Sequence, residues 1–82
     1  MTSNPNVILY EISDCPFCAK VNRYLDSRNI VIPKKDIEFD STALEELQAV
    51  GGKTQVPCLF VNGKAMYESL DIIDWFKTQW IS

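Results

Sequence analysis

Two cysteines, Cys15 and Cys18, are the residues of this chain whose type and spacing could do chemistry; they lie in "EISDCPFCAK" (11–20). A Cys-x-x-Cys pair can hold half of a zinc site, form a disulfide, or exchange electrons with other thiols and disulfides. The chain has three cysteines and no histidine, so it is one ligand short of a four-cysteine zinc site. Redox chemistry is therefore the favoured interpretation, with half a zinc knuckle or two incidental cysteines as the alternative.

The elements around this pair strengthen the redox interpretation. The apolar run "VILY" (7–10) predicts a strand buried on both faces. Pro16 suits the first position of a helix, which we expect over residues 16–28. A Cys-x-x-Cys pair between a buried strand and a helix, inside a β-α-β unit, is typical of thiol–disulfide exchange proteins.

The helix start should give the two thiols different roles. Cys15 would face free N–H groups and the positive end of the helix dipole, so we expect its pKa to fall below the ordinary value of about 8.5. Cys18 lies one turn further in, where it should be less exposed, less ionised and able to attack a mixed disulfide on Cys15. The negative charges of Glu11 and Asp14 act against a lowered pKa.

The middle of the chain predicts a second strand and a short helix. Residues 30–39 favour a strand that is weakened near Pro33. Thr42-x-x-Glu45 has the form of a capping box at the start of the helix, which Gly51 and Gly52 would end. We expect its apolar face to consist of Leu44, Leu47 and Val50.

The last third predicts two strands and a helix. Asn62-Gly63 is a strong hairpin signal between strands at 56–61 and 64–67. A final helix starts near Ser69, and its apolar face would contain Leu70, Ile73, Phe76 and Trp80. The order β-α-β-α-β-β-α, with a right-handed parallel crossover at its start, predicts an α/β fold with a mixed four-stranded sheet flanked by three helices.

Composition limits the classes of function. At 82 residues the chain is expected to form one domain, 1–82. The net charge is −3 and the basic residues are scattered, which argues against nucleic-acid binding. No apolar run approaches the ~20 residues of a membrane helix, and the polar opening "MTSNPN" does not resemble a signal peptide. We expect a cytoplasmic monomer.

Three stretches and their spacing resemble a known family across nearly the whole chain. They are "CPFC" at 15–18, "QVP" at 55–57 and "YESLDI" at 67–72. The sequence resembles a glutaredoxin, which implies a thioredoxin-like fold and a glutathione-dependent thiol–disulfide oxidoreductase. By this resemblance Cys15 and Cys18 form the redox-active disulfide. The enzyme would reduce protein disulfides and protein–glutathione mixed disulfides, with glutathione as co-substrate and no metal or tightly bound cofactor.

The resemblance also implies a glutathione site. Pro57 would follow a cis peptide bond, Val56 would pair its backbone with the cysteinyl residue of glutathione, and Phe17 would form an apolar shoulder beside Cys15. The alternative for Pro57 is an ordinary trans proline at the start of a strand. Lys53 or Thr54 could contact the glycyl carboxylate, although Lys53 is equally well explained as a solvated charge.

The third motif departs from the usual glutaredoxin pattern. Tyr67 and Glu68 stand where two glycines are typical, and Glu68-Ser69 is similar to the N-terminal domains of glutathione transferases. In those domains the pair binds the γ-glutamyl group. Here Ser69 would also serve as the N-cap of the last helix, or only as that.

Two further positions leave alternatives open. Ile12 replaces the usual lysine three residues before the first cysteine, which removes an expected cation. Cys58 is interpreted as a small buried strand residue, with a third redox thiol as the alternative.

Two other functions remain open. The chain could be a transferase-like glutathione domain, or a glutaredoxin that holds an iron–sulfur cluster between subunits, which Pro16 disfavours.

Overall fold

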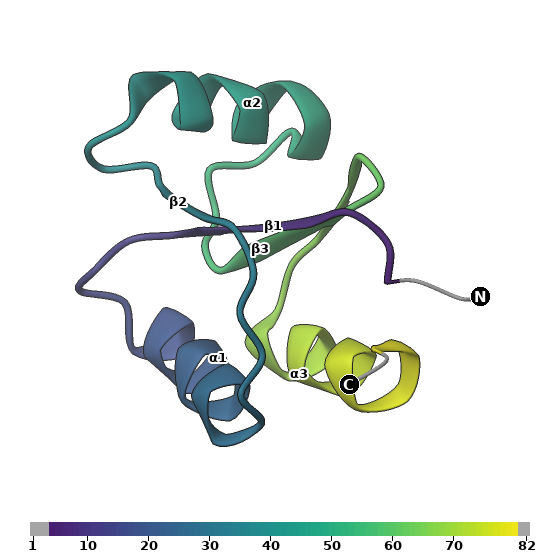
Figure 1. Ribbon diagram of the computed structural model, residues 1–82. Helices are drawn as coiled ribbons and strands as arrows, with labels where there is room; N and C mark the ends of the chain where they lie inside the picture. The colour runs from purple at the N-terminus through teal and green to yellow at the C-terminus, as the bar shows by residue number, and fades with distance from the viewer. Residues whose placement is uncertain (1–3, 81–82) are drawn as a thin grey trace.

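The computed structural model describes residues 4–80 and has the expected order of four strands and three helices (Figure 1). The first three and the last two residues, and with them part of the opening segment, lie outside this description. The elements are β1 (Val7–Glu11), α1 (Pro16–Ser27), β2 (Lys34–Asp36), α2 (Ser41–Gly51), β3 (Cys58–Val61), β4 (Lys64–Met66) and α3 (Ser69–Gln79).

The four strands form one mixed sheet in the order β2-β1-β3-β4. β2 runs parallel to β1, with Leu9 opposite Lys34. β3 is antiparallel to β1, and β4 is antiparallel to β3. The parallel pair needs the crossover through α1, which places the start of that helix at the carboxyl edge of β1. The α/β architecture expected from the sequence is confirmed.

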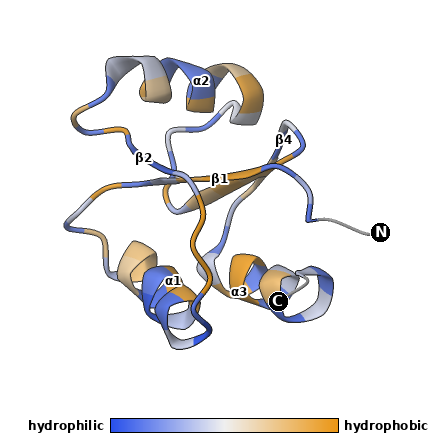
Figure 2. Cartoon of the chain, viewed as in Figure 1, coloured by the Kyte–Doolittle hydropathy of each residue, from blue (hydrophilic) through white to orange (hydrophobic). Residues whose placement is uncertain are grey.

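The helices cover both faces of the sheet, with α1 and α3 on one side and α2 on the other (Figure 1). Successive strand residues point to opposite faces, so Leu9 belongs to the core beneath α1 and α3 while Tyr10 packs under α2. Figure 2 shows β1 as a largely apolar strand and both apolar and polar residues along each helix. No helix within residues 4–80 is long and apolar enough to cross a membrane.

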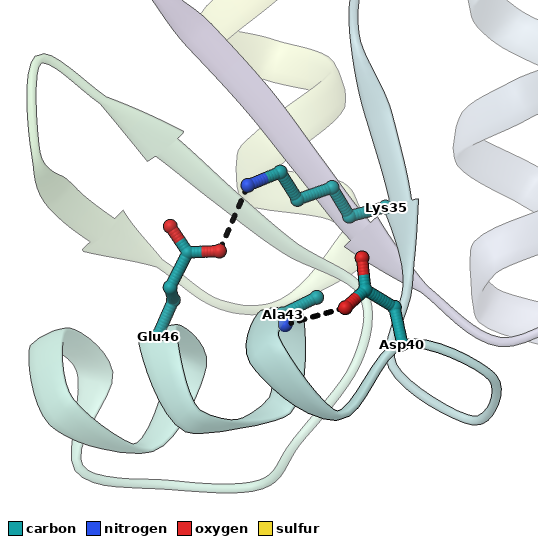
Figure 3. Close-up of polar contacts among 4 residues, drawn as sticks. All are labelled: Lys35, Asp40, Ala43 and Glu46. Carbon is teal, nitrogen blue, oxygen red and sulfur yellow. Dashed lines mark hydrogen bonds and ion pairs between the residues drawn. The ribbon is translucent and has the colours of Figure 1, made fainter.

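The second strand and its helix differ from expectation at their ends. The strand expected over 30–39 is wrong in length, because only Lys34–Asp36 pair with β1. Asp40, not Thr42, is the N-cap of α2: its carboxylate accepts from the backbone N–H of Ala43 at 3.1 Å (Figure 3). A helix that begins two residues earlier leaves Thr42 exposed in its first turn, where it caps nothing.

The apolar face of α2 is also narrower than predicted. Ala43 and Leu47 are its fully buried residues, whereas Val50 is 49% exposed. Glu46 lies near the sheet and forms an ion pair with Lys35 of β2 at 2.8 Å (Figure 3). Both side chains keep more than a third of their surface exposed, so this pair contributes little to stability.

The hairpin and the last helix follow the prediction more closely. Asn62 and Gly63 have φ angles of 51° and 82°, as the expected two-residue turn requires. β3 begins at Cys58, later than the predicted 56. Leu70 is 64% exposed, so its assignment to the buried face of α3 is wrong; Ile72 takes that place. Trp80 follows the helix and packs against the core.

Candidate active site

Cys15 is the N-cap of α1, at the carboxyl edge of the sheet. Its backbone is extended (φ −103°, ψ 116°), and its sulfur accepts a hydrogen bond from the N–H of Cys18 at 3.2 Å. The sulfur thus takes the position of the side-chain oxygen in an ordinary N-cap. Pro16 occupies the first helical position, where its missing N–H costs nothing. A partly exposed sulfur at this point meets the positive end of the helix dipole.

Cys18 differs from Cys15 in burial. Its side chain is 2% exposed, and burial raises the pKa of its thiol to about 12, with the hydrogen bond to Cys15 as the next cause and the charge of Glu11 a smaller one. Cys18 is therefore a neutral thiol near pH 7. The structure brings the two thiols together and makes one accessible and the other buried.

Asn22 is a polar neighbour of this pair that the sequence did not indicate. Its amide nitrogen donates to the carboxylate of Glu11 at 2.7 Å and to the backbone carbonyl of Cys18 at 3.0 Å. These bonds join the end of β1 to the first turns of α1. They also hold one negative charge near Cys18, and Asp14 adds another immediately before Cys15.

The loop before β3 faces the cysteine pair. The peptide bond between Val56 and Pro57 is cis, which confirms the conformation implied by the resemblance. The thiol of Cys15 lies 3.9 Å from the carbonyl oxygen of Val56, a long hydrogen bond to sulfur. The backbone of this loop is thus a direct neighbour of the Cys15 sulfur.

A small cavity of about 90 Å³ lies against this loop. Its lining includes five residues predicted from the sequence to contact glutathione: Phe17, Val56, Pro57, Glu68 and Ser69. The sixth lining residue, Gln55, was not predicted, although it is the first residue of the "QVP" stretch. Its amide nitrogen donates to the Glu68 carboxylate at 3.3 Å. The lining contains one carboxylate and no cation.

Glu68 and Ser69 each lie one position further into α3 than the sequence predicts. Glu68 holds the N-cap position of α3 with no side-chain capping bond, so the prediction that Ser69 caps this helix is wrong. The backbone of Glu68 has φ 69°, a value that residues other than glycine seldom adopt. Ser69 is the first helical residue and is 7% exposed, at the edge of the cavity.

The remaining predicted contacts lie further from the cavity. Lys53 is not among the lining residues, and its ammonium lies 5.4 Å from the centre of the Tyr67 ring. Its contact with glutathione stays a prediction. Cys58 is a fully buried strand residue in the core under α2, and burial raises the pKa of its thiol to about 11. Within residues 4–80, no three Cys, Asp or Glu side chains gather into a metal-binding group.

Comparison with known proteins gives the family. The sequence profile of the family Glutaredoxin matches residues 7–66. Glutaredoxin 1 of Rickettsia typhi is 33% identical over 60 residues, which cover 68% of this chain and 56% of that protein. The chain spans little more than half the length of such curated relatives.

Solved structures give the same fold. A variant of the thioredoxin-like protein BC3987 superimposes with a TM-score of 0.76 at 19% identity, over 89% of this chain and all of that one. Glutathione transferase Omega 3C from Trametes versicolor gives 0.75 at 25% identity, over 92% of this chain and 34% of that protein. The fold is thioredoxin-like, and the chain belongs to the glutaredoxin family.

Proposed function

We propose that this protein is a glutathione-dependent thiol–disulfide oxidoreductase that reduces protein disulfides and protein–glutathione mixed disulfides. The observation that carries this proposal is the asymmetric pair at the start of α1. Cys15 is partly exposed and accepts an N–H bond at its sulfur, while Cys18 is buried with a raised pKa. The Cys15 thiol is accessible for attack, and the Cys18 thiol is buried beside it, where it can later displace a target bound to Cys15.

In the first step the Cys15 thiolate attacks the glutathione sulfur of a mixed disulfide. The bond between that sulfur and the target protein breaks, and the target leaves as a thiolate that takes up a proton. The cavity against the loop before β3 then receives part of the glutathione moiety. The backbone of Val56 would pair with its cysteinyl residue, and Glu68 and Ser69 would bind its γ-glutamyl group. The presence of all three residues in the cavity lining supports these roles.

In the second step a glutathione thiolate attacks the glutathione sulfur bound to Cys15. Oxidised glutathione leaves, and Cys15 returns as a thiolate. The sum is one mixed disulfide and one glutathione converted into one protein thiol and one glutathione disulfide. With a protein disulfide as substrate, Cys18 can displace the target instead and form the Cys15–Cys18 disulfide. Such a cycle needs a reducing compartment, so we place the protein in the cytoplasm.

The test is turnover of a glutathionylated peptide with glutathione by the wild type, Cys15→Ser and Cys18→Ser. We expect the wild type and Cys18→Ser to turn over and Cys15→Ser to be inactive. The control is the thermal unfolding of each variant, which shows that inactivity is not loss of fold. An inactive wild type with intact fold refutes the use of glutathione, and an active Cys15→Ser refutes the assigned nucleophile.

A transferase-like reaction is the second candidate, and the Glu68–Ser69 pair at the cavity favours it. There glutathione itself would be the nucleophile towards a small electrophile, and no cysteine would be consumed. Conjugation of 1-chloro-2,4-dinitrobenzene by Cys15→Ser discriminates the two. Retained conjugation supports the transferase-like reaction, and its absence together with an active wild-type reductase excludes it.

A further inference from the structure

Tyr67 lies between β4 and α3, beside the site but outside the lining of its cavity. Its hydroxyl donates to the backbone carbonyl of Lys53 at 3.2 Å. The Tyr67 ring also packs against the core cluster that contains Cys58. The ammonium of Lys53 lies over the ring, 5.4 Å from its centre. One side chain thus bonds to Lys53 at the start of the segment 53–58 and packs against the cluster that holds Cys58 at its end.

The end of α2 is shaped to accept this tyrosine. A Cβ atom on Gly51 would lie 1.8 Å from the Tyr67 hydroxyl oxygen and 2.9 Å from ring atom Cζ. No side chain fits at that distance, so the glycine leaves the space that the tyrosine fills. Gly52 is the C-cap of α2, and its left-handed backbone (φ 74°) ends the helix just before the proline loop, residues 53–57.

The proline loop carries the groups that face the redox centre. The carbonyl oxygen of Val56 is the neighbour of the Cys15 sulfur at 3.9 Å, and Gln55, Val56 and Pro57 line the cavity. Lys53, Thr54 and Gln55 are exposed, so packing does little to fix this part of the loop. The hydrogen bond from Tyr67 to the carbonyl of Lys53 anchors the start of the loop.

We propose that Tyr67 is a positioning residue that holds the proline loop against Cys15 and so determines how tightly the site binds the glutathione moiety of its substrate. This inference rests on the proposed function. Tyr67 stands where the resemblance gives a glycine, so the anchor is a feature of this chain. Without the hydroxyl, the loop loses its bond at Lys53, and the backbone of Val56 spends less time in the binding geometry.

The test is Tyr67→Phe, which keeps the ring over Gly51 and removes only the hydroxyl. Tyr24→Phe is the matched control, because Tyr24 lies on α1 and lines a separate hollow. Loss of one hydrogen bond corresponds to about a fivefold change in an equilibrium. We expect the KM for the glutathionylated peptide to rise about fivefold in Tyr67→Phe, with a smaller change in kcat. We also expect amide hydrogen exchange in 53–56 to accelerate at least as much.

Two further readouts separate this role from a general structural one. The alkylation rate of Cys15 by iodoacetamide, which needs no binding cavity, should stay within twofold of wild type. Tyr24→Phe should change neither KM nor exchange in the loop. Unchanged exchange in Tyr67→Phe overturns the inference, and so does a fall in kcat with KM unaltered. If the wild type does not use glutathione, the proposed function fails, and the exchange measurement alone then decides whether Tyr67 anchors the loop.

Discussion

The backbone N–H of Cys18 lies 3.2 Å from the sulfur of Cys15, so the first turn of α1 joins the two cysteines through a hydrogen bond. The same turn sends the Cys18 side chain into the protein, where it is 2% exposed. A helix start thereby makes two chemically identical groups different. The pH dependence of each step in the redox cycle should reveal this difference.

The first prediction concerns ring closure by Cys18. In the isolated mixed disulfide between Cys15 and glutathione, Cys18 must lose its proton before it can displace glutathione. Burial is the main cause that raises the pKa of Cys18 to about 12, and burial persists in this intermediate. Release of glutathione should therefore be slow at pH 7 and accelerate about tenfold per pH unit up to pH 9.

Acid quench and chromatography of released glutathione measure this rate. Cys18→Ser is the control and should release none. A release rate that is constant between pH 6 and pH 8 would contradict the prediction, because it would mean that Cys18 is already ionised.

The second prediction concerns Cys58 and alkaline stability. Burial raises the pKa of its thiol from 9.0 to about 11 in the folded protein. Between these pH values the unfolded chain loses the proton while the folded chain keeps it, so the free energy of unfolding falls as pH rises. Cys58→Ala removes this contribution. Urea unfolding at pH 8 and pH 10.5 should show a smaller loss of stability for Cys58→Ala than for the wild type; equal losses would refute the assignment.

The third prediction tests the start of α2. Asp40→Ala removes the carboxylate that accepts from the N–H of Ala43 and should lower the free energy of unfolding by about 1 kcal/mol. Thr42→Ala is the matched control, since Thr42 is exposed in the first turn, and it should change stability by less than about 0.5 kcal/mol. Chemical denaturation compares the two. A larger loss of unfolding free energy for Thr42→Ala than for Asp40→Ala would support the capping box that the sequence suggests.

Local patterns explain which parts of the fold were predictable. The strand at Val7, the helix start at Pro16 and the turn at Asn62-Gly63 each depend on backbone preferences of a few adjacent residues. The start of α2 was missed because Asp40 and Thr42 both fit a capping pattern. In the structure the N–H of Asp40 donates to the carbonyl of Asp36 at the end of β2, and the end of β2 lies where its pairing with β1 stops, which is not local.

The same distinction applies to the site. Cys15, Cys18 and Pro57 belong to short motifs, so the sequence indicated them. Gln55 and Asn22 form hydrogen bonds to residues 13 and 11 positions away in the sequence, and no local sequence pattern predicts such pairs. Glu68 has a backbone angle that predicts glycine, so neither its N-cap position nor that angle could be inferred from its residue type.

The fourth prediction concerns the charge beside Cys15. Asp14 precedes the nucleophile and is exposed, and the cavity lining adds Glu68 without a cation. Glutathione disulfide is an anion, so Asp14→Asn should accelerate its reaction with Cys15 about two- to threefold at low salt. Asp26→Asn, at the far end of α1, is the control and should have little effect. The gain should disappear near 1 M salt, where the screening length is about 3 Å; a gain that persists there would rule out a charge effect.

The last prediction tests the contact between Gly51 and Tyr67. Gly51→Ala places a Cβ 1.8 Å from the tyrosine hydroxyl oxygen, so the ring must move and the free energy of unfolding should fall by about 1–3 kcal/mol. In a Tyr67→Ala background the ring is gone, and the same substitution should be neutral or stabilising, because alanine is favoured over glycine inside a helix by about 0.5–1 kcal/mol. Urea unfolding of the two single variants and the double variant measures the coupling. If Gly51→Ala costs the same in both backgrounds, the tyrosine does not occupy the space beside the glycine, and its role as the anchor of the proline loop loses its structural basis.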